Sequence, residues 1–358
     1  MKARIADEGK PLVTGWDIGG AHLKMAQVEN GRIVAASTMK ASMWLGLGEV
    51  REALAALRSR YSFNGPNVFT MTGELSDGFA NRNEGVRGLL DFIDAEFGSK
   101  NSLIYAGRAG FVGLPAARTR GPDIASANWH ATATLAARLR SEGLFVDMGS
   151  TTTDILAFRE RALRNTGYTD AERLQSGELV YTGFTRSALI GIAERVPVRG
   201  TMTPLMNEYF ANTADIARIL EMLDEADDQY PAADRRDKTV EASIGRLARM
   251  VGRDGPDLER REWLDIAGWF SEHQLRMIHD GALRVAADGR VDGAAPVIGA
   301  GVGRPQIVRL AARLERPYVD FADLIPATET SREDASKAAP AAAVALLSGA
   351  HLVENTMA

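Results

Sequence analysis

The feature that most constrains the fold is an internal duplication at a spacing of 130 residues. The first copy is residues 17–28 (Asp-Ile-Gly-Gly-Ala-His-Leu-Lys-Met-Ala-Gln-Val), and the second is residues 147–158 (Asp-Met-Gly-Ser-Thr-Thr-Thr-Asp-Ile-Leu-Ala-Phe). In each copy an aspartate ends an apolar run, small residues follow, and another apolar run begins. This pattern is typical of two strands joined by a tight turn. The chain is therefore predicted to build one strand–turn–strand element twice.

The segments around the two copies predict an α/β fold, in which helices cover a sheet. After the first copy, Asn30-Gly31 favours a type I′ hairpin turn into a third strand, and Glu160-Arg161 takes the same place after the second copy with weaker turn chemistry. Residues 224–238 are crowded with charge and are expected to form an exposed loop. Further strands are expected at 32–39, 67–72, 103–106 and 295–298, and helices at 49–61, 84–97, 123–139, 185–195, 212–226, 240–251, 261–280 and 306–314.

The C-terminal segment predicts a buried helix. Thr330 and Glu333 have the spacing of a capping box, which marks a helix start. The alanine-rich residues that follow are apolar on every face at 342–347. This helix is therefore expected to cross back over an apolar surface.

Composition excludes several classes of protein. The 358 residues suffice for two domains or for one large domain with lobes. A net charge of −5 argues against a nucleic-acid binder, and the absence of cysteine excludes disulfides, thiolate metal sites and thiol nucleophiles. Residues 1–10 have no apolar signal region, and the most apolar stretch, 338–350, is too short to span a bilayer. A cytoplasmic protein without membrane contact is expected, and its oligomeric state is left open.

Both turns of the duplication have the composition of an anion site. Small residues let backbone N–H groups approach an anion, and serine and threonine hydroxyls add donors. Carboxylates at Asp17 and Asp147 facing the same anion require a divalent cation between them, most plausibly Mg²⁺. Lys24 is expected to reach the anion as a point charge. The alternative is a plain hairpin with a carboxylate at its edge. The expected anion-binding residues are Gly19, Gly20, Gly149, Ser150, Thr151 and Thr152.

A third glycine-rich segment follows the expected strand at 295–298. Gly299, Gly301 and Gly303 imitate a dinucleotide-binding fingerprint, but Arg304 stands where its third glycine belongs. Only 55 residues follow Gly303, too few for the rest of such a sheet. A strand-to-helix glycine turn in a phosphate-binding fold is the better interpretation.

These three segments together resemble the actin, sugar kinase and Hsp70 ATPase superfamily. Residues 17–20 look like its phosphate-1 motif, 147–154 like its phosphate-2 motif, and 298–303 like its adenosine motif. The resemblance implies a two-lobed ATPase-like α/β fold. Its first lobe would be residues 11–142 plus 330–355, and its second 143–329, with a helical insertion at about 198–290 and the glycine turn at 299–303.

A closer resemblance rests on five further segments. They are similar to the hydantoinase/oxoprolinase-related branch of tetrahydromethanopterin-linked C1-transfer proteins. That branch implies a transferase of methanofuran biosynthesis, which couples an aminomethyl-furanylmethyl diphosphate to the phenol oxygen of γ-glutamyl-tyramine, or of a glutamyl-tyrosine analogue. An ether forms and pyrophosphate leaves. The segments are residues 16–24, 70–77, 125–129, 177–183 and 204–210.

This resemblance implies roles for the residues already singled out. Lys24, the two turns and Mg²⁺ held through Asp17 and Asp147 would stabilise the departing pyrophosphate. Arg186 is expected to bind the glutamyl carboxylates, unless it forms a salt bridge on a helix surface. Alternatives are an ATP-dependent small-molecule kinase and a nucleotide-gated interaction module. The candidates for the base that takes the phenol proton are Glu74, Asp77, Asp154 and Glu178, and Asn128 and Trp129 are candidates for lining the site.

Overall fold

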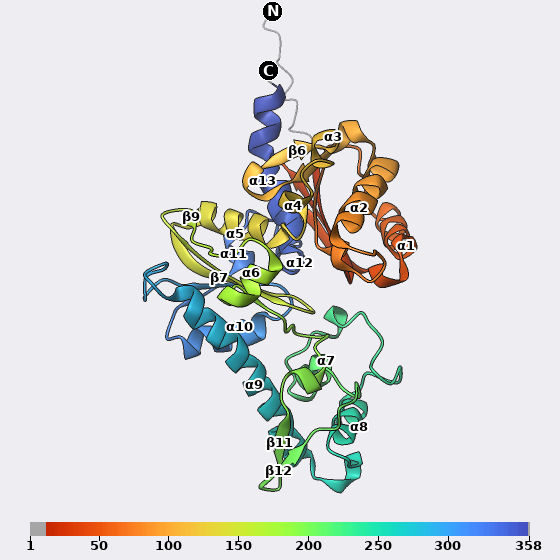
Figure 1. The fold of residues 1–358 in the computed structure, drawn as a ribbon, viewed down its shortest axis with the longest axis vertical. Coiled ribbons are helices and arrows are strands. Elements are labelled where there is room, and N and C mark those ends of the chain that lie inside the picture. Colours follow the sequence, from red (N-terminus) through yellow and green to blue (C-terminus); the bar gives the residue numbers. More distant parts are fainter. Residues whose placement is uncertain (1–11, 357–358) are drawn as a thin grey trace, which may run out of the picture. The chain divides into compact units, whose positions relative to one another are not determined.

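The computed structural model describes residues 12–356, with side chains described for residues 12–349. The chain folds into two units (Figure 1). Unit 1 contains the described residues up to Leu139 together with those from Phe321 onward, and unit 2 is Arg140–Asp320.

Unit 1 is built on a six-stranded sheet with the order β3-β2-β1-β4-β5-β6. β1, β4 and β5 run parallel, whereas β2, β3 and β6 pair antiparallel with their neighbours. Its strands are β1 (Val13–Ile18), β2 (His22–Glu29), β3 (Arg32–Lys40), β4 (Asn67–Met71), β5 (Ser102–Tyr105) and β6 (Phe111–Gly113). Its helices are α1 (Leu47–Arg58), α2 (Arg82–Phe97), α3 (Leu114–Ala117), α4 (Gly121–Ile124), α5 (Asn128–Leu139), α11 (Phe321–Leu324), α12 (Arg332–Lys337) and α13 (Ala339–Thr356).

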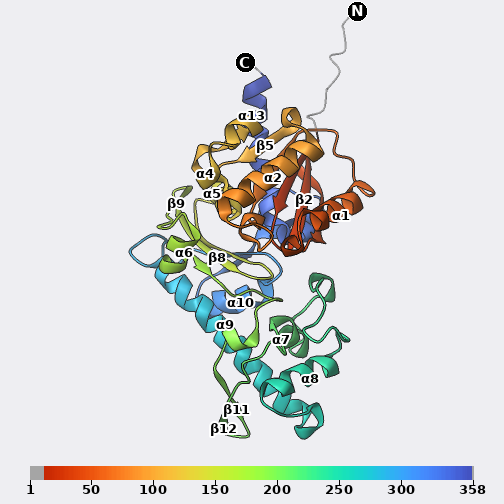
Figure 2. The same ribbon diagram turned by 45° about the vertical axis from the view of Figure 1, so that its right-hand side comes forward.

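Helices cover both faces of this sheet (Figures 1 and 2). Alternate residues of β1 point to opposite faces, as the two-residue period of a strand requires. Trp16 and Ile18 join the core formed with α1 and α2, whereas Gly15 lies against α13. Residues 341–345 of α13 are completely buried, so the expected alanine-rich crossing helix is confirmed. The expected capping box is wrong, because Ser331 precedes α12 and its hydroxyl donates to the Ile33 carbonyl instead.

Unit 2 repeats the central part of this arrangement. Its sheet has the order β10-β8-β7-β13-β14, with β9 pairing to β8. β7, β13 and β14 run parallel, and β8 is antiparallel to β7. The strands are β7 (Glu142–Met148), β8 (Thr153–Arg159), β9 (Ala162–Leu163), β10 (Leu179–Val180), β13 (Val297–Ala300) and β14 (Tyr318–Asp320), and the helices beside them are α6 (Asp170–Ser176) and α10 (Arg304–Arg313).

Between β10 and β13 the chain forms a further, largely helical part of unit 2. It contains the hairpin of β11 (Arg195–Val198) and β12 (Thr201–Pro204) with α7 (Thr213–Ile219), α8 (Val240–Met250) and α9 (Arg260–Ala286). The 27-residue α9 joins two cores: Trp263 and Phe270 pack with α8 and the hairpin, whereas Leu275 and Ile278 pack on the sheet. Figure 1 shows α9 running from the sheet to this helical part.

The duplication is visible in hydrogen bonds as well as in sequence. Gly19 N–H donates to the His22 carbonyl at 2.9 Å, and Gly149 N–H donates to the Thr152 carbonyl at 2.9 Å. The expected hairpin after the first copy has positive φ at Asn30 (50°), and the hairpin after the second has it at Glu160 (55°). Both strand–turn–strand predictions and both hairpins are confirmed.

Several expected helices differ from the observed ones. The helix expected at 123–139 is interrupted at Ser126, whose φ of 52° is left-handed. The helix expected at 212–226 ends at Ile219, and no α-helix forms at 185–195, where the backbone N–H groups of Thr185 and Arg186 donate to the Ser150 carbonyl. The loop expected at 224–238 is only partly exposed. Short 3₁₀ turns are η1 (Met43–Leu45), η2 (Gly73–Leu75), η3 (Ser99–Asn101), η4 (Gly107–Ala109), η5 (Leu189–Gly191), η6 (Glu225–Asp227) and η7 (Gly255–Asp257).

Within residues 12–356, no helix combines the length and the apolar character needed to cross a bilayer.

The contact between Gly15 and α13 yields a stability prediction. A Cβ at position 15 would lie 2.1 Å from the Ala341 carbonyl oxygen and 2.8 Å from the Ala345 Cβ, so α13 would have to move. Gly15→Ala is expected to lower the free energy of unfolding by about 2 kcal/mol or more, measured by urea denaturation. Gly48→Ala is the matched control, because nothing lies within 4 Å of a Cβ there. Equal stability of the two variants would contradict this packing.

Candidate functional site

The turn between β1 and β2, residues 19–22, is held against the end of β4. We call it the phosphate-1 turn. Thr72 N–H donates to the Ile18 carbonyl at 3.0 Å, and a Cβ at Gly73 would come within 3.1 Å of the same oxygen. At Gly20 a Cβ would meet nothing within 4 Å, so that side of the turn is open. The small residues here allow a close approach of backbone to backbone at Gly73 and of solvent to backbone at Gly20.

Asp17 and Lys24 face each other across this turn as cross-strand partners. The Lys24 Nζ lies 3.6 Å from Asp17 Oδ2. The Asp17 side chain is 2% exposed and that of Lys24 is 21% exposed. The buried carboxylate therefore pairs with the Lys24 ammonium group, and the lysine side chain remains partly exposed, which leaves Lys24 able to contact an anion as well.

Glu74 lies just beyond the end of β4, in the η2 turn. It is completely buried, and its Oε1 accepts a hydrogen bond of 2.7 Å from the Ser126 hydroxyl. Asn128 begins α5 two residues later, with its Oδ1 accepting from Trp129 N–H at 2.7 Å. Trp129 itself belongs to the core, with 2% exposure. Of the residues predicted to contact substrate in this region, Asp77 is exposed and Asn128 is half-buried.

A tyrosine–histidine pair occupies the end of β5, at the same edge of the sheet. The Tyr105 hydroxyl and His130 Nδ1 are 2.8 Å apart. Burial lowers the pKa of His130 to about 4, and the positive charge of Arg108 adds to the effect. The ring is therefore neutral at physiological pH. Sequence analysis did not single out His130, because a lone histidine in a helix carries no spacing signal.

The turn between β7 and β8, residues 149–152, is the corresponding element of unit 2. We call it the phosphate-2 turn. The segment 183–186 packs against it: a Cβ at Gly183 would lie 2.3 Å from Thr151 N, and Arg186 N–H donates to the Ser150 carbonyl at 2.9 Å. The Arg186 Nη1 is 3.4 Å from the Thr151 hydroxyl. Arg186 therefore lies at the phosphate-2 turn, in a segment where the expected helix is replaced by irregular chain and the short 3₁₀ turn η5.

The glycine-rich segment packs on the same turn. Gly303 N–H donates to the Met148 carbonyl at 2.9 Å. Gly301 has a φ of 84°, and a Cβ there would come within 2.5 Å of Asp147 Oδ1. Gly299 lies inside β13, where a Cβ would meet the Tyr318 ring at 2.7 Å. The glycine turn therefore begins at Gly301, and Gly299 packs against Tyr318 inside β13, while its part in diphosphate binding stays a prediction.

Two of the four candidate bases are already engaged within unit 2. Asp154 pairs with the buried Arg173 guanidinium, which a helix, α6, supplies. Both oxygens of Glu178 accept hydrogen bonds, from Thr166 N–H at 2.5 Å and Gly167 N–H at 2.8 Å among others. Through these contacts Asp154 and Glu178 hold the polypeptide around β8 and β10, and their roles as bases stay predictions. The sequence offered no signal for Arg173, because its partner lies 19 residues away.

The residues proposed for Mg²⁺ fit that ion in donor chemistry. Asp17 and Asp147 supply carboxylate oxygens at equivalent positions of the two copies, and Mg²⁺ is commonly bound through one or two carboxylates plus phosphate oxygens. Among residues 12–356, no group of three or more histidine, aspartate or glutamate side chains is arranged to hold a metal. The Mg²⁺ expected from the sequence stays a prediction, in which the ion binds together with a phosphate ligand.

The two sheets share the same order of strands, and each contains the same hydrogen-bonded turn. This arrangement defines the class of protein, which is the actin, sugar kinase and Hsp70-like ATPase fold. The chain is similar to the nucleotide-free structure of an acetone carboxylase described for ATP-dependent acetone carboxylation, with a TM-score of 0.56 and 9% identity, covering 94% of this chain and 70% of that one. Residues 67–315 match the hydantoinase/oxoprolinase family, and the chain belongs to that family.

Two curated relatives narrow the relationship. The chain is 30% identical over 340 residues to the (4-{4-[2-(γ-L-glutamylamino)ethyl]phenoxymethyl}furan-2-yl)methanamine synthase of Methanocaldococcus jannaschii, covering 94% of this chain and 98% of that protein. It is 31% identical over 144 residues to the synthase of the same name from Methanococcus vannielii, covering 40% of this chain and 64% of that protein. These named relatives support an enzyme.

The buried His130 yields a prediction for the pH dependence of stability. Its pKa in the folded protein is about 4, against 6.5 for a free side chain. The unfolded chain therefore binds the proton first, so stability is lost as the pH falls from about 6.5 to about 4 and not further below. The loss attributable to this residue is about 3 kcal/mol.

The measurement is urea unfolding between pH 4 and pH 7 for the wild-type protein and for His130→Gln, which cannot titrate. The wild-type free energy of unfolding should fall more steeply with acid than that of the variant. Parallel curves would show that His130 does not titrate as its burial requires.

Proposed function

We propose that this protein joins an aminomethyl-furanylmethyl diphosphate to the phenol oxygen of γ-glutamyl-tyramine, or of a glutamyl-tyrosine analogue, in methanofuran biosynthesis. The observation that carries this proposal is the 30% identity to the Methanocaldococcus jannaschii synthase along 94% of the chain. The name of that enzyme describes a phenoxymethyl-furan product, which is an aryl ether. The composition of both anion-type turns suits a diphosphate.

The reaction breaks one C–O bond and forms another. The bond between the furfuryl carbon and the diphosphate oxygen breaks, and its electron pair leaves with pyrophosphate. The furan oxygen delocalises the positive charge left on the carbon. The phenol oxygen then forms the new C–O bond, and its proton passes to a base. No oxidant or reductant is needed.

In this proposal the protein stabilises the negative charge that develops on pyrophosphate. Stabilisation of such charge by fixed donors is usually the largest single contribution to catalysis. Lys24 supplies a cation at the phosphate-1 turn, where its ammonium group pairs with the buried Asp17 carboxylate. At the phosphate-2 turn the donors are the backbone and hydroxyl groups of Ser150 and Thr151, with Arg186 beside them. The proposal requires both turns to contact the same diphosphate.

The position of Arg186 changes its proposed ligand. Sequence analysis assigned it to the glutamyl carboxylates of the acceptor. Its 3.4 Å contact with the Thr151 hydroxyl favours a phosphate oxygen instead, since a planar guanidinium pairs with two oxygens of such a group. We therefore propose Arg186 as a diphosphate ligand.

Mg²⁺ is part of the proposal. When bound with the diphosphate through Asp17 and Asp147, it would supply further positive charge to the leaving group. The proton of the phenol, with an ordinary pKa of about 10, must also be removed. Since Asp154 and Glu178 are engaged elsewhere, Glu74 and Asp77 are the remaining proposed bases, and Glu74 already accepts a hydrogen bond from a hydroxyl group.

The first experiment identifies the reaction by its products. Purified protein with Mg²⁺ is incubated with the furan diphosphate and γ-glutamyl-tyramine, or with γ-glutamyl-tyrosine in a parallel reaction. Equal amounts of ether, measured by mass spectrometry, and of pyrophosphate are expected, with no nucleotide present. Adding EDTA should stop both. ADP formation from ATP without ether formation would favour the small-molecule kinase instead.

The second experiment tests the cation of the phosphate-1 turn. Lys24→Ala is expected to lower kcat about 100-fold or more, because the loss of one donor to a developing oxyanion lowers kcat by about that factor in other enzymes. Lys40→Ala, an exposed lysine on the adjacent strand β3, is the matched control and should retain activity. Melting temperatures are recorded for both variants. Near-normal turnover in Lys24→Ala would remove this residue from the mechanism.

A further inference from the structure

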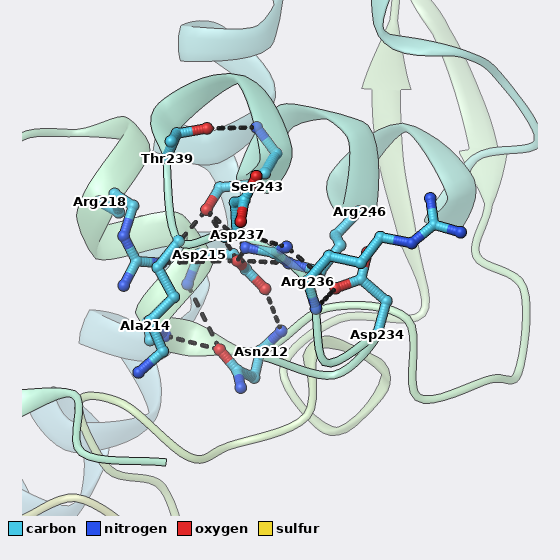
Figure 3. A network of polar contacts seen from close by, with 12 residues as sticks. Asn212, Ala214, Asp215, Arg218, Asp234, Arg236, Asp237, Thr239, Ser243 and Arg246 are labelled. Atoms are coloured by element: carbon cyan, nitrogen blue, oxygen red, sulfur yellow. Dashed lines mark hydrogen bonds and ion pairs between the residues drawn. The ribbon is translucent and has the colours of Figure 1, made fainter. Parts of the chain in front are cut away.

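Two buried arginines organise the loop at residues 224–238, which the sequence alone predicts to be exposed. Arg218 on α7 is 5% exposed and Arg246 on α8 is completely buried. Figure 3 shows the contacts around them. Asp215 forms ion pairs with both arginines. Arg246 Nε donates to its Oδ1 at 2.9 Å, and the Ser243 hydroxyl donates to the same oxygen at 2.8 Å.

The loop is bound to these arginines at both of its ends. On the N-terminal side, Arg218 donates to Asp228 at 2.7 Å and, through two nitrogens, to Glu225 at 2.8 Å. On the C-terminal side, Arg246 donates to Asp234 at 3.1 Å and to the Asp237 carbonyl at 3.0 Å. Charge-assisted hydrogen bonds to buried guanidinium groups are the strong class. The residues between these anchors are therefore held in one conformation.

Tyr230 lies between the two anchors, and it contacts the phosphate-2 turn through Arg186. The Arg186 guanidinium carbon is 4.6 Å from the centre of the Tyr230 ring, within the range of a cation–π contact. On its other side the same guanidinium approaches the Thr151 hydroxyl at 3.4 Å. Arg186 is thus placed between a ring that the loop positions and a turn that the sheet positions.

We propose that Tyr230 is a positioning residue for Arg186, and that the buried arginines act through it on the binding of a diphosphate. The inference rests on the function proposed above. An arginine that is free to rotate loses side-chain entropy when it binds an anion. The tyrosine ring removes part of that loss in advance, because it holds the guanidinium plane at the phosphate-2 turn before the ligand arrives.

The test measures the binding of inorganic pyrophosphate with Mg²⁺ by calorimetry, using the full chain. Tyr230→Leu is expected to weaken binding about fivefold, whereas Tyr230→Phe, which keeps the ring, should bind as the wild type does. Tyr61→Leu is the matched control, because Tyr61 makes a similar contact in unit 1. The guanidinium carbon of Arg60 lies 5.8 Å from the centre of its ring. Its pyrophosphate affinity should not change.

The decisive comparison is the double variant. Arg186→Ala alone should weaken binding about tenfold or more, and adding Tyr230→Leu to it should weaken binding no further, because the ring acts only through the guanidinium. Additive losses, or wild-type affinity in Tyr230→Leu, would overturn the inference while leaving the ether-forming assay unaffected. Failure of the wild-type protein to bind pyrophosphate would overturn the inference and the proposed function together. Melting temperatures within a few degrees of wild type exclude a general loss of structure.

Discussion

The interaction on which both units depend is a single backbone hydrogen bond that closes a tight turn, from a glycine N–H to the carbonyl three residues later. It makes residues 17 and 24 cross-strand partners in one unit and residues 147 and 154 partners in the other. Because side chains directly opposite in an antiparallel pair lie about 5 Å apart, this bond decides which two groups meet at the edge of each sheet. Both copies have an aspartate at the first of these two positions. The residue opposite it differs, because it is a lysine in the first copy and an aspartate in the second.

That divergence gives the two turns different electrostatics. Lys24 is the partner of Asp17 and is partly exposed, so unit 1 supplies a cation from the strand itself. Asp154 is the partner of Asp147, and two adjacent carboxylates repel each other. Arg173, buried and donated by α6, neutralises Asp154. The half-buried Arg186, from the segment after β10, is then the cation beside this turn. The cation beside the duplicated turn thus comes from the second strand in unit 1 and from a later segment of the chain in unit 2.

How well the sequence predicts the structure depends on how far apart in the chain the interacting residues lie. The turns and hairpins were predictable because glycine, asparagine and small residues act within four positions of one another. No α-helix forms at 185–195, where the chain is bound to the phosphate-2 turn instead: the backbone N–H groups of Thr185 and Arg186 donate to the Ser150 carbonyl, a partner about 35 residues earlier that no local pattern contains. The break at Ser126 has the same origin, since its hydroxyl bonds to Glu74 from 52 residues away. Functional side chains lie at these long-range contacts, so their roles required the structure.

Buried ion pairs add little net stability, since desolvation offsets most of their attraction, and apolar replacements often serve as well. The cluster around Arg218 and Arg246 therefore has little reason to exist as a source of stability for this part of unit 2, where Trp263, Phe270 and their neighbours already form an apolar core. What charge pairs provide, and apolar contacts do not, is a defined geometry for a loop rich in acidic residues. A loop shaped in this way can hold one aromatic ring over one guanidinium group, and the anchoring residues Asp228 and Asp234 flank that ring in the sequence.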